Sequence, residues 1–313
     1  MTTKSMRQQF ADTMLAVGQE DPNLVVLVGD ISHFILQPFA KACPGRYYNV
    51  GICEAAIVTM AAGLAKVGFY PVVHTIAPFI IERPFEHIKL DFCYQKLGGN
   101  IVTVGSAFDY ATLGCTHHCY DDFALIKTLP GTQITYPACP VEFDVLFRQT
   151  YRNNALTLFR VPGQQHGQDF TARDIKFGRG IKVTEGSNLT VIATGPQLGN
   201  ALASRDALDD MGWHAEILYI HTIRPLDMEL IRASVNKTRR VLVIEEHMRS
   251  GGLGDDVLRG TINIPDVRYA FLSIPDEFVT GYGSYQEHCD HLGLNREGIL
   301  NIVRNEFGTG GGR

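Results

Sequence analysis

The chain has 313 residues, enough for about two domains of ordinary size. Its 45% of hydrophobic and 19% of charged residues are typical of a globular protein and exclude wholesale disorder. The formal charge is −5, with 28 Lys and Arg residues against 33 Asp and Glu residues, and no cluster of basic residues offsets it. Nucleic-acid binding is therefore not expected, because it needs a basic surface.

The first half of the chain alternates short apolar runs with helix-like segments. Five β-branched runs predict buried parallel strands: Leu24–Val28, Pro71–Thr75, Ile101–Val104, Gln133–Tyr136 and Leu156–Phe159. Three intervening segments predict helices: Thr3–Gln19, Ala55–Lys66 and Glu82–Gln95. This alternation is typical of an α/β fold built on a parallel sheet.

A second series of the same kind follows a polar stretch that contains several glycines. Residues 162–187 predict a linker that ends in an entry strand. Strands are then predicted at Leu189–Ala193, Ala215–Tyr219 and Val241–Glu245, and helices at Gly199–Met211, Asp227–Asn236 and Gly254–Gly260. We therefore expect two doubly wound α/β domains, residues 1–161 and 188–313, joined by the linker 162–187.

Targeting and metal signals are weak in this sequence. The N-terminus carries no apolar run of a signal peptide, and the longest apolar stretch, around residues 57–79, is interrupted by Lys66 and His74. The seven cysteines are scattered, and no pair of them has the matching second half of a zinc site. We expect a cytoplasmic protein with free thiols, no membrane span and no metal held by this chain.

The segment most suggestive of chemistry runs from Arg46 to Ala56. A strand-like piece leads into Gly51, and a helix starts near Glu54, where the positive end of the helix dipole favours a carboxylate. By itself this indicates either a functional acid or an ordinary helix-start residue. The following helix, Ala55–Lys66, is rich in alanine and glycine, so it can pack closely on another backbone, including one across a subunit boundary.

Several motifs together resemble the transketolase family of thiamine diphosphate enzymes. In the first domain they match the family's pyrimidine-binding domain, and in the second its C-terminal domain, in the family's order. The matching segments are Arg46–Ala65, Gly68–Val73, Thr116–His118, Leu156–Pro162, Val191–Gly195, Ile223–Asp227 and Glu245–Gly254. The resemblance covers most of the chain.

The resemblance implies a cofactor-binding role for four residues. The glutamate that matches Glu54 contacts N1′ of the aminopyrimidine and promotes its amino–imino tautomerisation, a task that needs a carboxyl group. Phe79 and Phe85 match aromatic residues that pack on the pyrimidine, although the sequence fits Phe85 equally well as an ordinary core residue. Glu82 stands where transketolases carry a further aromatic residue. Asp30 follows a strand end, in the loop that approaches the cofactor.

For substrate, the resemblance implies His117 and Arg160. The histidine that matches His117 reaches the substrate and has a catalytic role, while the arginine that matches Arg160 binds its distal phosphate; a guanidinium suits any such oxyanion, sulfonate included. His118 is expected to be a structural hydrogen-bonding residue. At Leu113, transketolases and 1-deoxyxylulose-5-phosphate synthases commonly have an aspartate, so the substrate pocket is expected to differ.

The family's Gly-Asp-Gly motif, which anchors Mg²⁺ and the cofactor's diphosphate, does not occur in this sequence. The resemblance therefore implies the C-terminal subunit of a split transketolase of carbohydrate metabolism, with thiamine diphosphate and Mg²⁺ anchored mainly by a separate N-terminal subunit. We expect an α₂β₂ heterotetramer with a dimeric core of this chain, transferring a two-carbon ketol unit from a ketose to an aldose.

Three alternatives stay open at this point. One is the β subunit of a 2-oxo-acid dehydrogenase E1 component, the second a 1-deoxy-ketose-phosphate synthase-like enzyme, and the third a non-catalytic partner subunit. The Thr116–His118 context and Arg160 favour the transketolase, and the presence of Glu54 speaks against a non-catalytic chain. Phosphorylated, sulfonated and branched ketoses are all compatible with the sequence.

Overall fold

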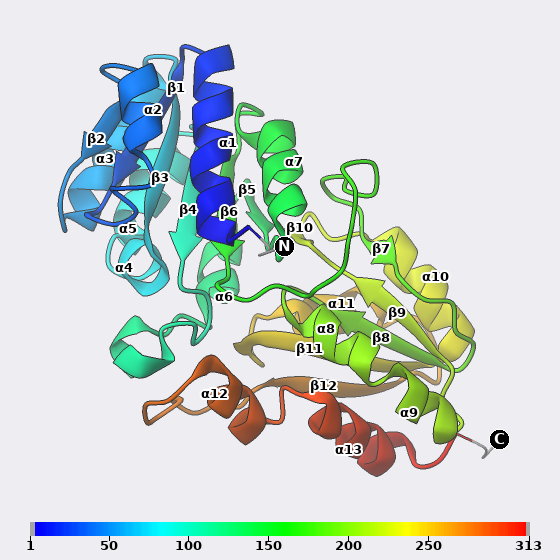
Figure 1. The fold of residues 1–313 in the computed structure, drawn as a ribbon. Helices are drawn as coiled ribbons and strands as arrows, with labels where there is room; N and C mark the ends of the chain where they lie inside the picture. Colours follow the sequence, from blue (N-terminus) through cyan, green and yellow to red (C-terminus); the bar gives the residue numbers. More distant parts are fainter. Residues whose placement is uncertain (1–3, 311–313) are drawn as a thin grey trace.

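The computed structural model describes residues 4–310, which form two largely parallel β-sheets (Figure 1). The first sheet has seven strands in the order β10-β5-β6-β4-β3-β1-β2. Its strands are β1 (Leu24–Val28), β2 (Tyr47–Asn49), β3 (Tyr70–Ile76), β4 (Gly99–Val104), β5 (Thr132–Thr135), β6 (Leu156–Val161) and β10 (Thr222–Arg224). All neighbouring strands pair in parallel except β10, which is antiparallel to β5.

Helices cover both faces of this sheet because successive side chains of its strands point to opposite sides. Val25 and Leu27 of β1 belong to one apolar cluster, and Leu24, Val26 and Val28 to another. The first cluster includes residues of α3 (Glu54–Lys66), α4 (Ala77–Ile81), α6 (Asp122–Lys127) and the π-helix η1 (Ile88–Tyr94), which follows the short α5 (Phe85–His87). The second includes residues of α1 (Met6–Glu20), α2 (Gln37–Ala42) and α7 (Pro140–Thr150).

The second sheet has five strands in the order β12-β11-β8-β9-β7. Its strands are β7 (Ile181–Lys182), β8 (Leu189–Ala193), β9 (Ala215–Tyr219), β11 (Arg240–Met248) and β12 (Arg268–Ile274). The accompanying helices are α8 (Gln197–Ala203), α9 (Arg205–Asp210), α10 (Met228–Thr238), α11 (Leu253–Thr261), α12 (Tyr285–Leu292) and α13 (Arg296–Phe307). The expected α/β class with two wound sheets is therefore confirmed.

The two sheets share one apolar core. Ile134 and Tyr136, in and just after β5, lie in the same buried cluster as Ile192 of β8 and Val241 of β11. The strand β10 belongs to the second half of the chain but extends the first sheet, and β7, inside the expected linker, pairs with β9. The chain thus crosses between its two halves more often than a simple linker requires.

Some expected elements have different limits in the structure. The expected helix Glu82–Gln95 is a turn at Glu82–Pro84 followed by α5 and η1. Pro84 explains the break, because proline cannot donate a helical hydrogen bond and disfavours helix in the residue before it. The expected helix Thr3–Gln19 starts at Met6, with Ser5 as its N-cap, and Thr3 lies outside the described residues. In residues 4–310 no helix has the length and apolar character needed to cross a membrane.

Candidate functional site

The expected cofactor residues gather where the strands β1, β2 and β3 end. Asp30 follows β1, Glu54 follows β2, and Phe79 follows β3. The carboxyl ends of parallel strands meet at one edge of a sheet, which is where α/β proteins bind their ligands. Strands far apart in the sequence therefore bring these residues to the same edge.

Glu54 is the first residue of α3 and is 5% exposed. Its carboxylate lies at the positive end of the helix dipole, and the cap residue Cys53 makes no side-chain hydrogen bond to the helix. Arg83 Nη1 donates to Glu54 Oε1 at 3.2 Å. A buried carboxylate at a helix start with a single cationic partner is a candidate functional acid.

Phe79 links this carboxylate to the expected substrate residue. The guanidinium carbon of Arg83 lies 3.9 Å from the centroid of the Phe79 ring. The ring of His117 meets Phe79 edge to face, with centroids 5.1 Å apart. Glu54, Phe79 and His117 therefore form one chain of contacts through Arg83, a residue that the sequence analysis did not single out.

The two adjacent histidines have different surroundings. His117, at the end of η3 (Cys115–His117), is partly exposed, and its Nδ1 lies 2.9 Å from Thr116 Oγ1. His118 is buried against Phe108 and His288, and neither of its ring nitrogens has a hydrogen-bond partner among residues 4–310. Burial and the nearby His288 lower the pKa of His118 to about 4, so its ring is neutral. The expectation that His118 is a hydrogen-bonding residue is therefore wrong.

Asp30 and Phe85 lie at the edges of this site. Asp30 has a left-handed backbone conformation, with φ of 55°, and it exchanges two hydrogen bonds with Asn49 at 3.0 and 3.1 Å. An exposed acid held in that way can face a ligand at the loop. Phe85 is half-buried and packs against the apolar cluster under α3 and η1, which fits its alternative role as a core residue.

Arg160 is 0% exposed, which does not fit the expected contact with a substrate's distal phosphate. Its Nε lies 3.1 Å from Asp122 Oδ2, and its Nη2 donates to the backbone carbonyls of Cys119 and Glu246. The guanidinium also lies 4.6 Å from the ring centroids of both Phe123 and Tyr136. Its charge is thus used inside the protein, where it joins β6, α6 and β11.

Replacing Arg160 with methionine should therefore destabilise the fold. The change leaves the Asp122 carboxylate buried without its cation, a loss of about 3–5 kcal/mol in the free energy of unfolding. Denaturant unfolding of the purified chain measures it. Arg152→Met is the matched control, because Arg152 also lies over a tyrosine but on the surface. Unchanged stability together with a raised KM for an anionic substrate would instead restore the substrate role of Arg160.

Arg7, in the first turn of α1, is a cation at the same edge of the sheet that the sequence analysis missed. Its Nη2 donates to Ser32 Oγ at 3.0 Å, while its Nε is buried without a hydrogen-bond partner. No ion pair involving Arg7 occurs among residues 4–310. His74 Nδ1 donates to the carbonyl of Val102, so its Nε2 accepts from Ser32, 2.8 Å away. Burial lowers the pKa of His74 to about 4, which keeps this histidine neutral and leaves Arg7 as the charged group.

The loop beside Arg7 is strained, since both Asp30 and Ser32 have positive φ angles, 55° and 56°. Burial raises the pKa of Tyr110, and the positive charge of Arg7 opposes this rise. The ring centroid of Tyr110 is 6.1 Å from that of His117. An uncompensated, partly buried guanidinium next to these groups is a candidate site for an anion.

Glu82 lies beside Phe79 in sequence and has acidic neighbours in space. Its carboxylate, the thiol of Cys119 and the carboxylate of Asp121 lie within 4.8 Å of one another. Partial burial, followed by repulsion from Asp121, raises the pKa of Glu82 from its usual 4.5 to about 7. The surroundings of Phe79 are thus more polar than a further aromatic residue would make them.

The raised pKa of Glu82 predicts a pH dependence of stability. The folded protein binds the Glu82 proton more tightly than the unfolded chain, so this stabilisation is complete below pH 4.5 and is lost as the pH rises through 7. Glu82→Gln should therefore melt higher than the wild type at pH 8, and this advantage should shrink toward pH 4.5. Thermal unfolding across this range measures it, with the exposed Glu86→Gln as control. A constant difference at all pH values would contradict the assignment.

A second polar cluster, Cys139, Glu142 and His166, is buried and has metal-ligand residue types. The backbone N–H of Gln168 donates to His166 Nδ1, so His166 Nε2 carries the proton that it donates to Glu142 at 2.8 Å. A nitrogen that carries a proton cannot bind a metal ion. We therefore assign this cluster a structural role, held together by hydrogen bonds.

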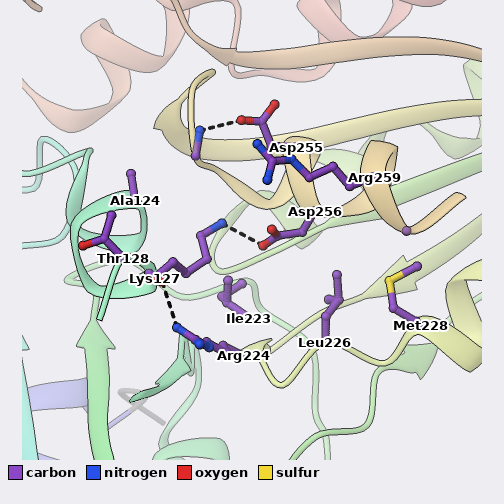
Figure 2. Close-up of a pocket in the computed structure, with 12 residues that line it drawn as sticks. Ala124, Lys127, Thr128, Ile223, Arg224, Leu226, Met228, Asp255, Asp256 and Arg259 are labelled. Atoms are coloured by element: carbon purple, nitrogen blue, oxygen red, sulfur yellow. Dashed lines mark hydrogen bonds and ion pairs between the residues drawn. The ribbon is translucent and has the colours of Figure 1, made fainter. Parts of the chain in front are cut away.

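A hollow of about 520 Å³ lies between α6, α11 and the segment after β10, and none of the expected site residues lines it (Figure 2). Lys127 Nζ donates to Asp256 at 2.7 Å, and Arg224 Nη1 donates to the carbonyl of Lys127 at 3.0 Å. Lys127 is thus paired with Asp256, and Arg224 is bonded to the backbone, so the hollow is not the candidate active site.

Two family profiles match the sequence. The one described as transketolase, pyrimidine binding domain, matches residues 2–167. The one described as transketolase, C-terminal domain, matches residues 178–299. A solved structure described as a split gene transketolase, inactive beta4 tetramer, superimposes with a TM-score of 0.88 at 28% identity, covering 97% of this chain and 99% of that chain.

The relatives fall into two groups, one of about the same length as this chain and one about twice as long. The chain is 32% identical to one of the subunits of the apulose-4-phosphate transketolase of Phocaeicola vulgatus, and the match covers 94% of each chain. It is 28% identical to a 6-deoxy-6-sulfo-D-fructose transketolase subunit of a Clostridium strain, over 80% of this chain and 78% of that one. The 1-deoxy-D-xylulose-5-phosphate synthase of Heliobacterium modesticaldum is 29% identical over 95% of this chain, but the match covers only 46% of that enzyme.

Proposed function

The chain belongs to the transketolase family, and on that premise we propose that it is the C-terminal subunit of a split, thiamine diphosphate-dependent transketolase. The observation that carries this proposal is Glu54, a buried carboxylate at a helix start whose partner Arg83 also lies over the ring of Phe79. An aminopyrimidine requires these two features, a carboxyl group for its ring nitrogen and a flat apolar wall. The residues present therefore fit the pyrimidine half of the cofactor.

In this proposal Glu54 holds the ring nitrogen, Phe79 stacks on the ring, and Asp30 and Phe85 border the site. When bound, thiamine diphosphate supplies the electron sink for breaking and forming the carbon–carbon bond. His117 lies beside Phe79 and orients the substrate's oxygen atoms, since an imidazole can donate or accept a hydrogen bond. The diphosphate and Mg²⁺ are assigned to the partner subunit, because the sequence has no Gly-Asp-Gly motif.

The surface around Glu54 supports assembly with other subunits. Apolar side chains are exposed on and near α3, and a shallow hollow there is lined by Tyr48, Met60, Gly63 and Leu64. Exposed apolar area of this kind marks protein interfaces. The solved relative, a tetramer of β chains described as inactive, is consistent with a chain that associates with itself and lacks half of each site. We propose an α₂β₂ complex with a transketolase N-terminal subunit.

We propose that the substrate is a ketose with an anionic distal group. Two relatives act, by name, on apulose 4-phosphate and on 6-deoxy-6-sulfofructose, both of which carry an anion far from the ketol carbons. Arg7 is the cation that the geometry offers for this group, since Arg160 is buried and paired. In this proposal the sugar would lie along Glu54, His117 and Tyr110, with its anionic end at Arg7.

Arg7→Gln should raise KM for a phosphorylated or sulfonated donor and leave short uncharged donors nearly unaffected. Loss of a charge-assisted contact to an oxyanion costs about 1.5–3 kcal/mol, or roughly ten- to hundred-fold in kcat/KM. Steady-state kinetics of the assembled complex with both kinds of donor measure the effect. An equal loss on both donors would show that Arg7 only supports the Ser32 loop.

The proposed function is tested by expressing the chain with an N-terminal-type partner and following ketol transfer in the presence of thiamine diphosphate and Mg²⁺. Transfer between an anionic ketose and an aldose supports the proposal. Decarboxylation of pyruvate or another 2-oxo acid without ketol transfer would favour the E1 β subunit or the 1-deoxy-ketose-phosphate synthase alternative. A complex that binds no thiamine diphosphate would favour a non-catalytic subunit.

A further inference from the structure

One guanidinium touches both residues that the proposed function places against the pyrimidine. Arg83 Nη1 donates to Glu54 Oε1 at 3.2 Å, and the guanidinium carbon lies 3.9 Å from the Phe79 centroid. We propose that Arg83 is a positioning residue, whose guanidinium fixes the Glu54 carboxylate and the Phe79 ring in the arrangement that the pyrimidine meets. This inference rests on the proposed function and assigns Arg83 an action through Glu54 and Phe79.

Glu54 needs a fixing partner because its own element gives it none. It is the first residue of α3, and the preceding residue makes no side-chain cap. Arg83 is the hydrogen-bonding partner of its side chain in the described part of the chain. A glutamate side chain has three rotatable bonds, and a buried one without a partner adopts several positions or draws in water. The single donor at Oε1 leaves Oε2 free to meet a ring nitrogen.

Phe79 is held from two directions. The cation covers one face of its ring, and His117 meets it edge to face at 5.1 Å. A stacking wall is effective only when its plane is fixed, so the cation on one face prepares the other face for a ligand. Lysine would not perform both tasks, because only the planar guanidinium can stack on a ring and donate to a carboxylate at once.

The backbone of the turn after α4 determines the position of Arg83. Arg83 lies four residues after Phe79, in the turn Glu82–Pro84 that follows α4. The hydrogen bonds from Glu82 N to Pro78 O at 3.0 Å and from Phe85 N to Glu82 O at 3.4 Å hold this turn. The Arg83 side chain is 51% exposed, so its contacts are made at the open rim of the site.

The first test needs no cofactor. Arg83→Met, Glu54→Gln and the double variant of the purified chain form a cycle for the free energy of unfolding at neutral pH. We expect Arg83→Met to destabilise the wild type, because the buried Glu54 side chain loses its cationic partner, and to destabilise the Glu54→Gln variant less. Arg152→Met, an arginine that also lies over an aromatic ring, is the control and should show no coupling to Glu54→Gln. Additive effects at Arg83 and Glu54 would overturn the inference.

The second test uses the assembled complex. Arg83→Met should lower turnover on the order of tenfold, the scale seen when a group that orients a functional ligand is removed, and Arg83→Lys should lie between this variant and the wild type. In the Glu54→Gln background, Arg83→Met should add little to the loss. Calorimetry with thiamine diphosphate and Mg²⁺ gives the affinity beside the turnover.

The outcomes separate this inference from the proposed function. If Glu54→Gln retains full turnover, or the wild-type complex does not bind the cofactor, the proposed function fails. If Glu54→Gln is impaired while Arg83→Met behaves as wild type, only the positioning role fails. A tighter cofactor affinity in Arg83→Met would show that the arginine obstructs the site, and a full additional loss in the Glu54→Gln background would show an independent ligand. Either result overturns the inference.

Discussion

Glu54→Gln is expected to lower the turnover of the assembled complex by about 10²–10⁴, the range lost when a general acid–base group is removed. The amide keeps the shape of the side chain and can still receive the hydrogen bond of Arg83, so the pyrimidine is still held. It cannot exchange a proton with the ring nitrogen, and the effect should therefore appear in kcat. Initial rates of ketol transfer measure it.

Glu297→Gln is the matched control for this change. Glu297 lies in the first turn of α13, so it shares the helix-start position of Glu54 but belongs to a distant element of the second half of the chain. We expect wild-type turnover from this variant. The melting temperature of Glu54→Gln should stay near that of the wild type, which separates loss of function from loss of fold. Near-normal turnover of a folded Glu54→Gln complex would exclude the proposed role.

The parts of the fold predicted well are those with a strong local signal. The strands Leu24–Val28, Leu189–Ala193 and Ala215–Tyr219 have the limits expected from the sequence, because each is a short run of buried and mostly apolar residues. The strand β10 has no such signal. It is three residues long and owes its place to β5, far away in the sequence, so only the tertiary structure reveals that it joins the first sheet.

The same division applies to the site. The strand, glycine and helix start around Glu54 left its role open in the sequence, and the resemblance to the transketolase family decided for a functional acid. The partners of Arg160 could not be predicted, since its ion pair with Asp122 and its bonds to Cys119 and Glu246 come from separate segments. Arg7 was missed because nothing near it in the sequence indicates a site; it becomes notable only when folding brings Ser32 to it.

The chain alone is expected to show no ketol transfer and to bind thiamine diphosphate weakly. In the proposed split enzyme this chain supplies only the residues for the pyrimidine, and the sequence has no Gly-Asp-Gly motif to anchor the diphosphate and Mg²⁺. Calorimetry of the lone chain with cofactor and Mg²⁺ tests this. Addition of an N-terminal-type partner should restore both tight binding and turnover. Stoichiometric binding with ketol transfer by the lone chain would refute the split-enzyme proposal.

Assembly with other subunits, and therefore turnover, should also depend on the surface around α3. Met60 is 44% exposed beside Tyr48 and Gly63, and Ile262, at the end of α11, is 70% exposed on the second half of the chain. Met60→Glu places a charge in the proposed interface and should shift the assembly to smaller particles with little turnover, since a buried charge without a partner is costly. Ile262→Glu adds the same charge to an exposed apolar position elsewhere and should leave mass and turnover unchanged. Light scattering after size exclusion distinguishes the two variants, and equal assembly of both would place the contact between subunits elsewhere.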